Sequence, residues 1–451
     1  MGIQVRQVSS ADHPVVEALL HEAFGDEPVA PLVTALRRCS GYVPEFELVA
    51  EDDGEVVGHV MLTWNHLLLD AGGRRPILVI APLAVRPDRW RCGIGRTLIE
   101  GVVRLAEAAG EPFAVLEGDP AYYGRLGFVA ASAYGVRAPS PTVPEVACQL
   151  YPIAGPDPAI AGRVMYDEAF WAHGGSGLPE ATDPDGGYPL PYLFHFAQLN
   201  GWIEAVTYGA DLDIPVTACP GWTLRDLLAH LEWAYRAAIC WDRTGAAPVP
   251  AGERATDGGT SPRDPLPGFA AAWRETHTTL LARPPATSSR GWTSADRTVG
   301  AWRRRMVHEV AVHAADVLES LPSPRFPWRI DDALALDGID HTLGVFAARL
   351  TGDTPAGGTP ADCESRALTV RLTTGNRPVT VTLDGQRLTV TGDVAVVPGS
   401  IRDAVPDALI EAEPADLYLW LWGRTPAGAV RVDGDQRTVE RFLEATRYAR
   451  S

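Results

Sequence analysis

The chain contains no lysine, so its 39 basic residues are all arginine, and they stand against 57 acidic residues for a net charge of −18. Without lysine, neither Schiff-base chemistry nor the lysine of a P-loop is available. The negative charge disfavours nucleic acid or an anionic membrane as the main partner. Small molecules are therefore the expected substrates, and the sequence carries no signal for an oligomeric state.

Cysteine pairs and long apolar runs are also missing. The six cysteines show no CxxC spacing, which argues against a disulfide framework or a cysteine-based zinc site and favours reduced thiols. No uncharged apolar run reaches about 18 residues, and the N-terminus shows a strand pattern in place of a basic-then-apolar leader. We therefore expect a soluble, cytoplasmic protein, and a chain of 451 residues should form roughly two to four domains.

A buried strand that leads through a glycine-rich turn into an amphipathic helix is the clearest binding signal. The apolar residues 76–87 (PILVIAPLAVRP) are closely followed by residues 90–110 (WRCGIGRTLIEGVVRLAEAAG). Backbone N–H groups at the helix start, unobstructed at Gly93 and Gly95, would face an anion that the helix dipole also favours. A GxG pattern is weak alone, because glycines often only shape a turn.

The neighbouring residues make the signal more specific. Residues 83–101 (LAVRPDRWRCGIGRTLIEG) and 116–128 (LEGDPAYYGRLGF) resemble the GCN5-related N-acetyltransferase (GNAT) family, especially a subgroup with a DPAYYGRFGF-like segment. The resemblance covers most of residues 1–171. It implies an α/β GNAT acetyltransferase fold with acetyl-CoA, or another acyl-CoA, as cofactor.

The same resemblance assigns the cofactor-binding residues. The strand residues that would offer backbone groups to pantetheine are Leu83, Ala84 and Val85. The turn and helix start that would hold the pyrophosphate are Arg91, Cys92, Gly93, Ile94, Gly95, Arg96 and Thr97. Trp90 departs from the family pattern, which usually has Gln or Arg there. We expect CoA binding to survive this change, because backbone N–H groups hold the pyrophosphate.

Two residues are candidates for the acid and base of acyl transfer. Tyr123 matches the family tyrosine that protonates the departing CoA thiolate; the alternative is a packed aromatic with a satisfied hydroxyl. Glu117, at the end of a predicted strand, is the candidate general base, and it could equally be a solvated acid.

A second domain is expected after a linker at residues 172–188, which are rich in Gly, Pro and acid. Helical patterns that would form a four-helix bundle follow at residues 190–208, 223–242, 264–281 and 299–318. The second helix should begin with Thr223 as N-cap and Asp226 as its capping partner.

The fourth helical pattern carries polar groups at metal-ligand spacing. Glu309 and His313 are four apart and share one face, whereas His308 and His313 are five apart, so the string HEVAVH is not a zinc-protease HExxH. His230 in the second pattern could supply a third ligand, as in bundle proteins that build metal sites between facing helices. A lone helical histidine is nonetheless more often a core or surface residue than a ligand.

Residues 216–236 and 304–318 together resemble the mycothiol-dependent maleylpyruvate isomerase family of DinB-like metal-binding bundles. The resemblance implies a divalent metal, usually zinc, held by His230, Glu309 and His313, with mycothiol as thiol cosubstrate. A thiol at the open position of a three-ligand zinc loses its proton. Mycothiol is an actinobacterial thiol, in agreement with a lysine-free composition typical of a very GC-rich genome.

Several other polar residues lie near these ligands in the sequence, and two of these positions have two interpretations. Asp316 could orient a ligand imidazole or merely be solvated. The arginines at 303–305 are most simply a solvated helix start, although they could hold a carboxylate substrate. His308 is expected to be structural.

The last part of the chain alternates between strand and helix patterns. A helix at residues 330–350 leads into three strands, with Asp384-Gly385 as a hairpin dipeptide, and then into residues 416–424 (DLYLWLWGR). This part resembles the α+β, sterol-carrier-protein-like C-terminal domain of the isomerase family. Arg424 could meet a substrate carboxylate there or cap helix-end carbonyls.

The sequence thus predicts a GNAT domain at residues 1–171, a metal-binding bundle at 189–327 and a C-terminal domain at 328–451. The leading hypothesis is a fusion enzyme that acylates an amine and uses a metal and mycothiol on a small electrophile. In one alternative, one domain is a lapsed binding module that senses a thiol, metal or CoA. In another, the thiol differs or the metal activates water.

Overall fold

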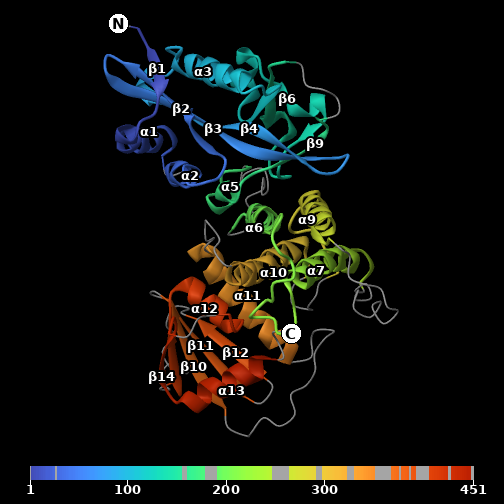
Figure 1. The fold of residues 1–451 in the computed structure, drawn as a ribbon. Coiled ribbons are helices and arrows are strands. Elements are labelled where there is room, and N and C mark those ends of the chain that lie inside the picture. Colours follow the sequence, from blue (N-terminus) through green and yellow to red (C-terminus); the bar gives the residue numbers. More distant parts are fainter. Residues whose placement is uncertain are drawn as a thin grey trace. The chain divides into compact units, whose positions relative to one another are not determined.

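The computed structural model shows two compact units (Figure 1). The described residues are 2–25, 28–154, 160–177, 190–245, 264–290, 297–321, 330–350, 367–374, 377–384, 387–392, 406–424 and 428–447. Unit 1 comprises residues 1–184, 193–211 and 323–327, and unit 2 comprises residues 185–192, 212–322 and 328–451. Most of the expected linker and Gly385 of the expected hairpin lie outside the described residues.

Unit 1 contains a mixed sheet whose main strand order is β1-β2-β3-β4-β5-β8-β6, with β9 paired to β3 and β7. Its strands are β1 (Gln4–Gln7), β2 (Tyr42–Asp52), β3 (Glu55–Leu69), β4 (Arg74–Val85), β5 (Phe113–Glu117), β6 (Val129–Ala130), β7 (Val136–Arg137), β8 (Cys148–Pro152) and β9 (Gly162–Met165). Its helices are α1 (His13–Phe24), α2 (Val29–Leu36), α3 (Ile94–Ala108), α4 (Pro120–Tyr123), α5 (Glu168–Ala172) and nearly all of α6 (Tyr192–Thr207).

Helix α3 is amphipathic and buries its apolar face on strands β2 to β4. Leu98, Ile99 and Val102 of this helix belong to one apolar core with residues of the sheet. At Gly58 of β3, an added Cβ would lie 2.8 Å from Ile94 and 2.9 Å from Leu98. The glycine therefore lets the start of α3 lie close to the sheet.

Strands β4 and β5 are parallel but pair only briefly. The paired residues are Leu78 with Ala114 and Val79 with Val115. Strand β4 continues to Val85, so its last part leaves one edge without a β5 partner. After this open edge the chain turns and enters α3, and the succession of strand, turn and helix is the one that the sequence predicted.

All four helices expected after residue 190 form, namely α6, α7 (Leu224–Thr244), α9 (Leu266–Leu281) and α10 (Val299–Ser320). The predicted capping box of α7, between Thr223 and Asp226, is present. Helix α6 groups with unit 1, where Glu204 pairs with Arg163. The packing of all four helices into one bundle stays a prediction.

The C-terminal part of unit 2 is α+β, as expected. Its sheet has the order β12-β11-β10-β13-β14. The strands are β10 (Leu368–Thr374), β11 (Arg377–Asp384), β12 (Arg387–Gly392), β13 (Ala408–Glu411) and β14 (Arg431–Gly434). The helices are α11 (Asp332–Leu350), α12 (Pro414–Leu421) and α13 (Gln436–Arg447).

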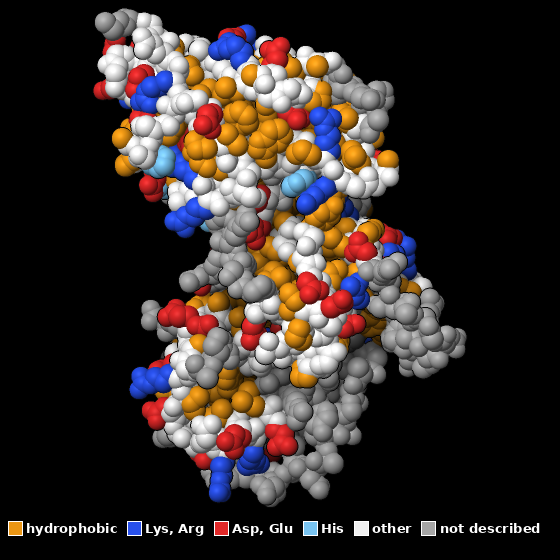
Figure 2. Space-filling model, viewed as in Figure 1, with side chains coloured by type: hydrophobic (Ala, Val, Ile, Leu, Met, Phe, Trp, Pro, Cys, Tyr) orange, Lys and Arg blue, Asp and Glu red, His pale blue; other side chains and the backbone are white. Residues whose placement is uncertain are grey.

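Charged side chains of both signs are interspersed over the visible face of each unit (Figure 2). Among the described residues, no helix is both long enough and apolar enough to cross a membrane.

Candidate functional site

The open edge of β4 presents backbone groups at alternate residues. Arg86 donates its N–H to the carbonyl of Val57 on β3, and Val85 lies opposite Gly58. Because hydrogen-bonded pairs alternate along an antiparallel ladder, Leu83 and Val85 turn their backbone groups away from β3. Ala84 turns its own toward β3. Of the three predicted pantetheine-binding residues, two therefore face the open edge.

A pocket of about 590 Å³ lies where this edge meets the start of α3. It is lined by Leu83, Val85, Arg89, Trp90, Arg91, Gly93, Ile94, Gly95, Arg96, Tyr122, Tyr123, Arg125 and Leu126. Four of these residues are arginines, and the first N–H groups of a helix lack intrahelical partners. The pocket thus combines cationic side chains with a helix start, an arrangement suited to a phosphate group.

The turn before α3 contains two residues with a positive φ angle. Gly93 has φ = 84°, which glycine adopts readily, and Arg91 has φ = 64°, which is uncommon for a residue with a side chain. Arg91 has no ion-pair partner among the described residues, whereas Arg89 pairs with Asp52.

Two predicted turn residues, Cys92 and Thr97, do not line the pocket. Thr97 instead donates its hydroxyl to the carbonyl of Gly93 at 3.2 Å and so secures the first turn of the helix. The Cys92 thiol is exposed and lies 3.6 Å from the carbonyl of Trp90.

Tyr123 lies in the pocket at the end of α4. Its ring packs edge-on against Phe128 and Tyr122, with ring centroids 5.5 and 4.9 Å away. Burial, and to a lesser extent Tyr122, raises the pKa of the Tyr123 phenol above its usual value. The phenol therefore holds its proton throughout the neutral range, as a general acid must.

Tyr122, which was not among the predicted site residues, also lines the pocket. A Cβ added at Gly95 would collide with the hydroxyl of Tyr122, so this phenol lies directly on the start of α3. The sequence could have indicated Tyr122, because it stands beside Tyr123 in the same motif and the Gly95 that it contacts belongs to the glycine turn. Tyr122 is thus a second phenol close to the expected phosphate position.

Glu117 ends strand β5 but does not line the pocket. Its carboxylate accepts hydrogen bonds from the Ser176 hydroxyl at 3.0 Å and the Gly177 N–H at 3.1 Å, and also from Tyr166. Burial nevertheless raises the pKa of Glu117 above its ordinary value. The carboxylate thus fastens residues 176–177 to the sheet, and its role as a base stays a prediction.

In unit 2, helices α7 and α10 bring His230, Glu309 and His313 together. An oxygen of Glu309 lies 3.1 Å from Nε2 of His230 and 3.8 Å from Nε2 of His313. One ligand atom from each residue lies within 4.8 Å of the other two. Two imidazole nitrogens and a carboxylate oxygen are a donor set that suits zinc and similar divalent metals.

Electrostatics keep the Glu309 carboxylate ionised. Burial would raise its pKa, but the hydrogen bond from His230 and the charges of His230, Arg305 and His313 outweigh burial. The pKa of Glu309 is therefore held below its usual value, and the carboxylate is available as a ligand at neutral pH.

A buried carboxylate lies behind His313. Asp316 is 1% exposed, and one of its oxygens lies 2.9 Å from Nδ1 of His313. Its other oxygen accepts from Nε of Arg424 at 3.2 Å. The solvated interpretation of Asp316 is therefore wrong, and Nε2 of His313 is left to face Glu309 and His230.

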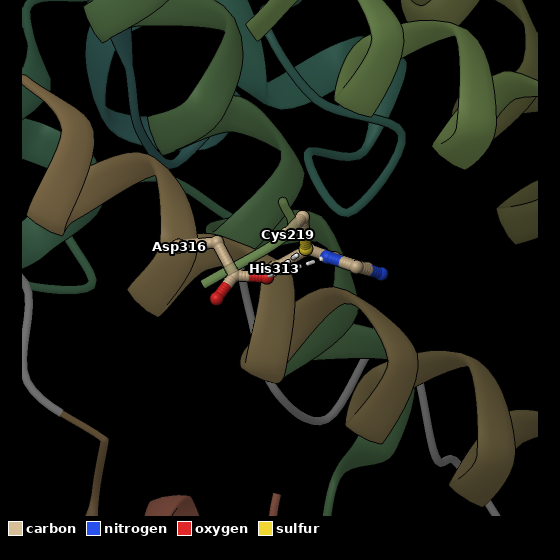
Figure 3. A group of neighbouring side chains, drawn as sticks. All are labelled: Cys219, His313 and Asp316. Carbon is tan, nitrogen blue, oxygen red and sulfur yellow. Dashed lines mark hydrogen bonds and ion pairs between the residues drawn. The ribbon is translucent and has the colours of Figure 1, made fainter. Parts of the chain in front are cut away.

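Cys219, from the loop before α7, completes this group (Figure 3). Its sulfur lies 3.6 Å from Asp316 and 3.5 Å from a guanidinium nitrogen of Arg424. Cys219, His313 and Asp316 could also hold a metal ion. Burial and then Asp316 raise the pKa of the thiol to about 11. The Arg424 guanidinium already bonds both Cys219 and Asp316 and would repel a cation there, so the set with His230 and Glu309 fits a cation better.

Arg424 is already engaged in the structure. Besides Asp316, it donates to the carbonyl of Trp422 at 2.7 Å, at the end of α12. The expected alternative, in which Arg424 caps helix-end carbonyls, thus describes one of its contacts. Its contact with a substrate carboxylate stays a prediction.

His308 and Arg303 of α10 have structural contacts. His308 is buried, with Nε2 2.8 Å from Asp337. Arg303 is 4% exposed and donates to the carbonyls of Leu280 and Arg283 at the end of α9, so the expectation of a solvated helix start is wrong for this residue.

Comparisons with known proteins match family models to both parts of the chain that carry these candidate sites. Residues 13–128 match the model of the acetyltransferase (GNAT) family, residues 195–318 that of the mycothiol maleylpyruvate isomerase N-terminal domain, and residues 333–441 that of the C-terminal domain of the same isomerase family.

Individual relatives match the N-terminal part of the chain. The uncharacterized N-acetyltransferase YhbS of Escherichia coli K12 is 34% identical over 164 residues, which are 35% of this chain and 93% of that protein. The crystal structure of E. coli YhbS in complex with CoA covers 37% of this chain and 91% of its own, with 31% identity and a TM-score of 0.34. A GNAT acetyltransferase from Brucella melitensis in complex with acetyl-CoA covers 38% of this chain and 98% of its own, with 28% identity and a TM-score of 0.31.

The comparisons place these families in the order that the sequence predicted. The chain belongs to the GNAT acetyltransferase family in its N-terminal part and continues into the N-terminal and then the C-terminal domain of the mycothiol maleylpyruvate isomerase family.

Proposed function

We propose that unit 1 transfers an acyl group from acyl-CoA to an amine. The observation that carries this proposal is the continuity of the open β4 edge, the start of α3 and the Tyr123 phenol within one pocket. The edge suits the amides of pantetheine, the helix start and arginines suit the pyrophosphate, and Tyr123 lines the same pocket. The resemblance to a named N-acetyltransferase over 93% of its length supports the same activity.

In this reaction the amine nitrogen bonds to the thioester carbonyl carbon, and the bond from carbon to sulfur then breaks. Tyr123 gives its proton to the departing thiolate, and its raised pKa keeps that proton available. The amine loses a proton to a base, for which Glu117 is the candidate. A carboxyl group with a raised pKa suits this role.

We further propose that unit 2 acts as a mycothiol-dependent transferase or isomerase on a small electrophile. His230, Glu309 and His313 would hold a divalent metal such as zinc, whose chemistry here is to keep a bound thiol ionised at neutral pH. Asp316 fixes the imidazole of His313 through Nδ1, and Arg424 holds Asp316 in place. Arg424 already bonds Asp316 and the carbonyl of Trp422, so an electrophile with a carboxylate would bind this guanidinium by sharing or displacing one of these contacts.

Separate experiments test the two halves. Calorimetry with acetyl-CoA, followed by acetyl transfer to a panel of amines, tests unit 1, and absence of acetyl-CoA binding would refute it. Metal analysis of the purified protein and of His313→Ala tests unit 2, which a metal-free wild type would refute. Turnover of electrophiles with mycothiol, with another thiol and without thiol distinguishes a mycothiol enzyme from a metal-dependent hydrolase.

A second candidate function is a binding module without turnover in unit 1. Trp90 favours this alternative, because its indole N–H already occupies the Val85 carbonyl at 2.7 Å on the edge that pantetheine would use. Stoichiometric acyl-CoA binding without any acylated product in the amine panel would support this candidate over acyl transfer.

A further inference from the structure

We propose that Trp90 recognises the nucleotide part of CoA, with its indole face stacked on the adenine ring. This inference rests on the acyl-CoA site proposed above and assigns a specific role to the residue that departs from the family pattern. It predicts that this protein distinguishes CoA from 4′-phosphopantetheine by an aromatic contact.

The exposure of Trp90 is the first observation. The side chain is 57% exposed, and it is the one aromatic among the exposed large apolar side chains of the described residues. A tryptophan left in water forfeits the stabilisation that its burial would bring. An exposed indole in the lining of a pocket therefore has a surface available to a ligand.

The second observation is that the ring is held in place. Its N–H donates to the carbonyl of Val85, the last residue of β4, at 2.7 Å. This hydrogen bond uses the polar edge of the indole and leaves its faces to apolar partners. A ring that is already fixed loses little conformational entropy when a second flat group stacks on it. Leu83 and the N–H of Val85 remain available to pantetheine on the same edge.

The third observation concerns the residues that line the pocket together with the Trp90 ring. Arg91, Arg96 and the glycine-rich start of α3 line the same pocket. Arg91 has no ion-pair partner among the described residues. An anion at the helix start would place an attached base close to the turn that carries Trp90. An aromatic face beside arginines and helix N–H groups matches a nucleotide, because bases stack on aromatic rings while phosphates bind cations.

Calorimetry with two ligands tests this role in the full-length protein. CoA contains the adenosine part, whereas 4′-phosphopantetheine lacks it. Trp90→Ala should weaken CoA binding about tenfold, which corresponds to the lower part of the range for one base stacked on an aromatic side chain. The affinity for 4′-phosphopantetheine should change by less than about twofold. Trp90→Phe retains an aromatic face and should stay within about threefold of wild type for CoA.

Trp90→Gln, which introduces a residue usual in the family, is a second truncation and should show the same selective loss. Equal weakening of both ligands in Trp90→Ala and Trp90→Gln would overturn the inference, because the ring would then act on pantetheine or on the shape of the turn. Unchanged CoA affinity in these variants would overturn it as well. A wild type that binds neither ligand would instead refute the acyl-CoA site itself.

Discussion

The Nδ1 atom of His313 lies 2.9 Å from a carboxylate oxygen of Asp316, which is buried and held on its other side by Arg424. The three residues come from helix α10 and from the segment after α12. The contact fixes the orientation of the imidazole and directs Nε2 toward Glu309 and His230. A carboxylate behind a ligand histidine is a common means of tuning metal affinity.

Asp316→Asn should therefore weaken metal binding by about 10- to 100-fold, because a neutral amide orients and polarises the imidazole less well. Competition with a chelator measures this affinity. Asp213→Asn is a matched control, because the Asp213 side chain is mostly exposed and its bond to Arg225 involves none of His230, Glu309 and His313. The metal affinity of this variant should equal that of wild type. Equal affinities for Asp316→Asn and wild type would show that Asp316 does not support the site.

The two adjacent phenols of unit 1 should differ in their effect on catalysis. Tyr123→Phe should lower kcat for acetyl transfer by about 10²- to 10⁴-fold, because the thiolate would leave without its proton donor. The KM for acetyl-CoA should change little. Tyr122→Phe is the matched control and should keep kcat within about threefold. A large loss of kcat in Tyr122→Phe with near-normal Tyr123→Phe would reverse the assignment.

The sequence predicted the parts of the sites that lie on one continuous segment. The strand, the glycine turn and helix α3 are adjacent in the chain. Gly93 indicates a positive φ, and Gly95 indicates a close contact, which Tyr122 makes. The register of strand β4 against β3 could not be predicted from the sequence in the same way. The alternation that turns Leu83 and Val85, but not Ala84, toward the open edge depends on the pairing with β3.

Contacts supplied by a distant segment could not be predicted from spacing alone. Asp316 could equally have been solvated, because nothing local shows that Arg424 and Cys219 cover it. Arg303 resembled a solvated residue because the carbonyls that it binds come from the end of α9. The sequence around Glu117 likewise does not indicate its hydrogen bond with Ser176, because Ser176 lies 59 positions further along the chain.

The proposed base Glu117 gives a prediction for pH dependence. Glu117→Gln should lower kcat about 100-fold or more, because an amide cannot accept the proton of the amine. In the wild type, activity should fall as the pH drops through the raised pKa of Glu117. The Ser176 hydroxyl stabilises the ionised carboxylate and so lowers this pKa.

Ser176→Ala should therefore raise the pKa of Glu117 further and move the acid limb of the pH profile of kcat/KM to higher pH. The plateau activity should remain close to that of wild type. Full activity in Glu117→Gln would show that the carboxylate only fastens residues 176–177 to the sheet.

His277 of helix α9 should make the stability of unit 2 depend on pH. It is fully buried, and neither ring nitrogen has a hydrogen-bond partner among the described residues. Burial, and then the charge of Arg303, lowers the pKa of His277 from 6.5 to about 4. His277 takes up a proton more readily in the unfolded chain than in the folded protein. Protonation of His277 therefore does not affect stability above about pH 6.5. As the pH falls from 6.5 to about 4, this protonation should remove up to about 3 kcal/mol of the free energy of unfolding.

His277→Leu should reduce this dependence, because leucine fills a similar volume and takes up no proton. The wild type should lose thermal stability between pH 7.5 and pH 5, and the variant should lose clearly less over the same interval. At pH 7.5 the variant should equal or exceed the wild type, since two unpaired buried nitrogens are removed. Parallel curves for the two proteins would mean that His277 is paired or hydrated in solution and that other groups cause the acid sensitivity.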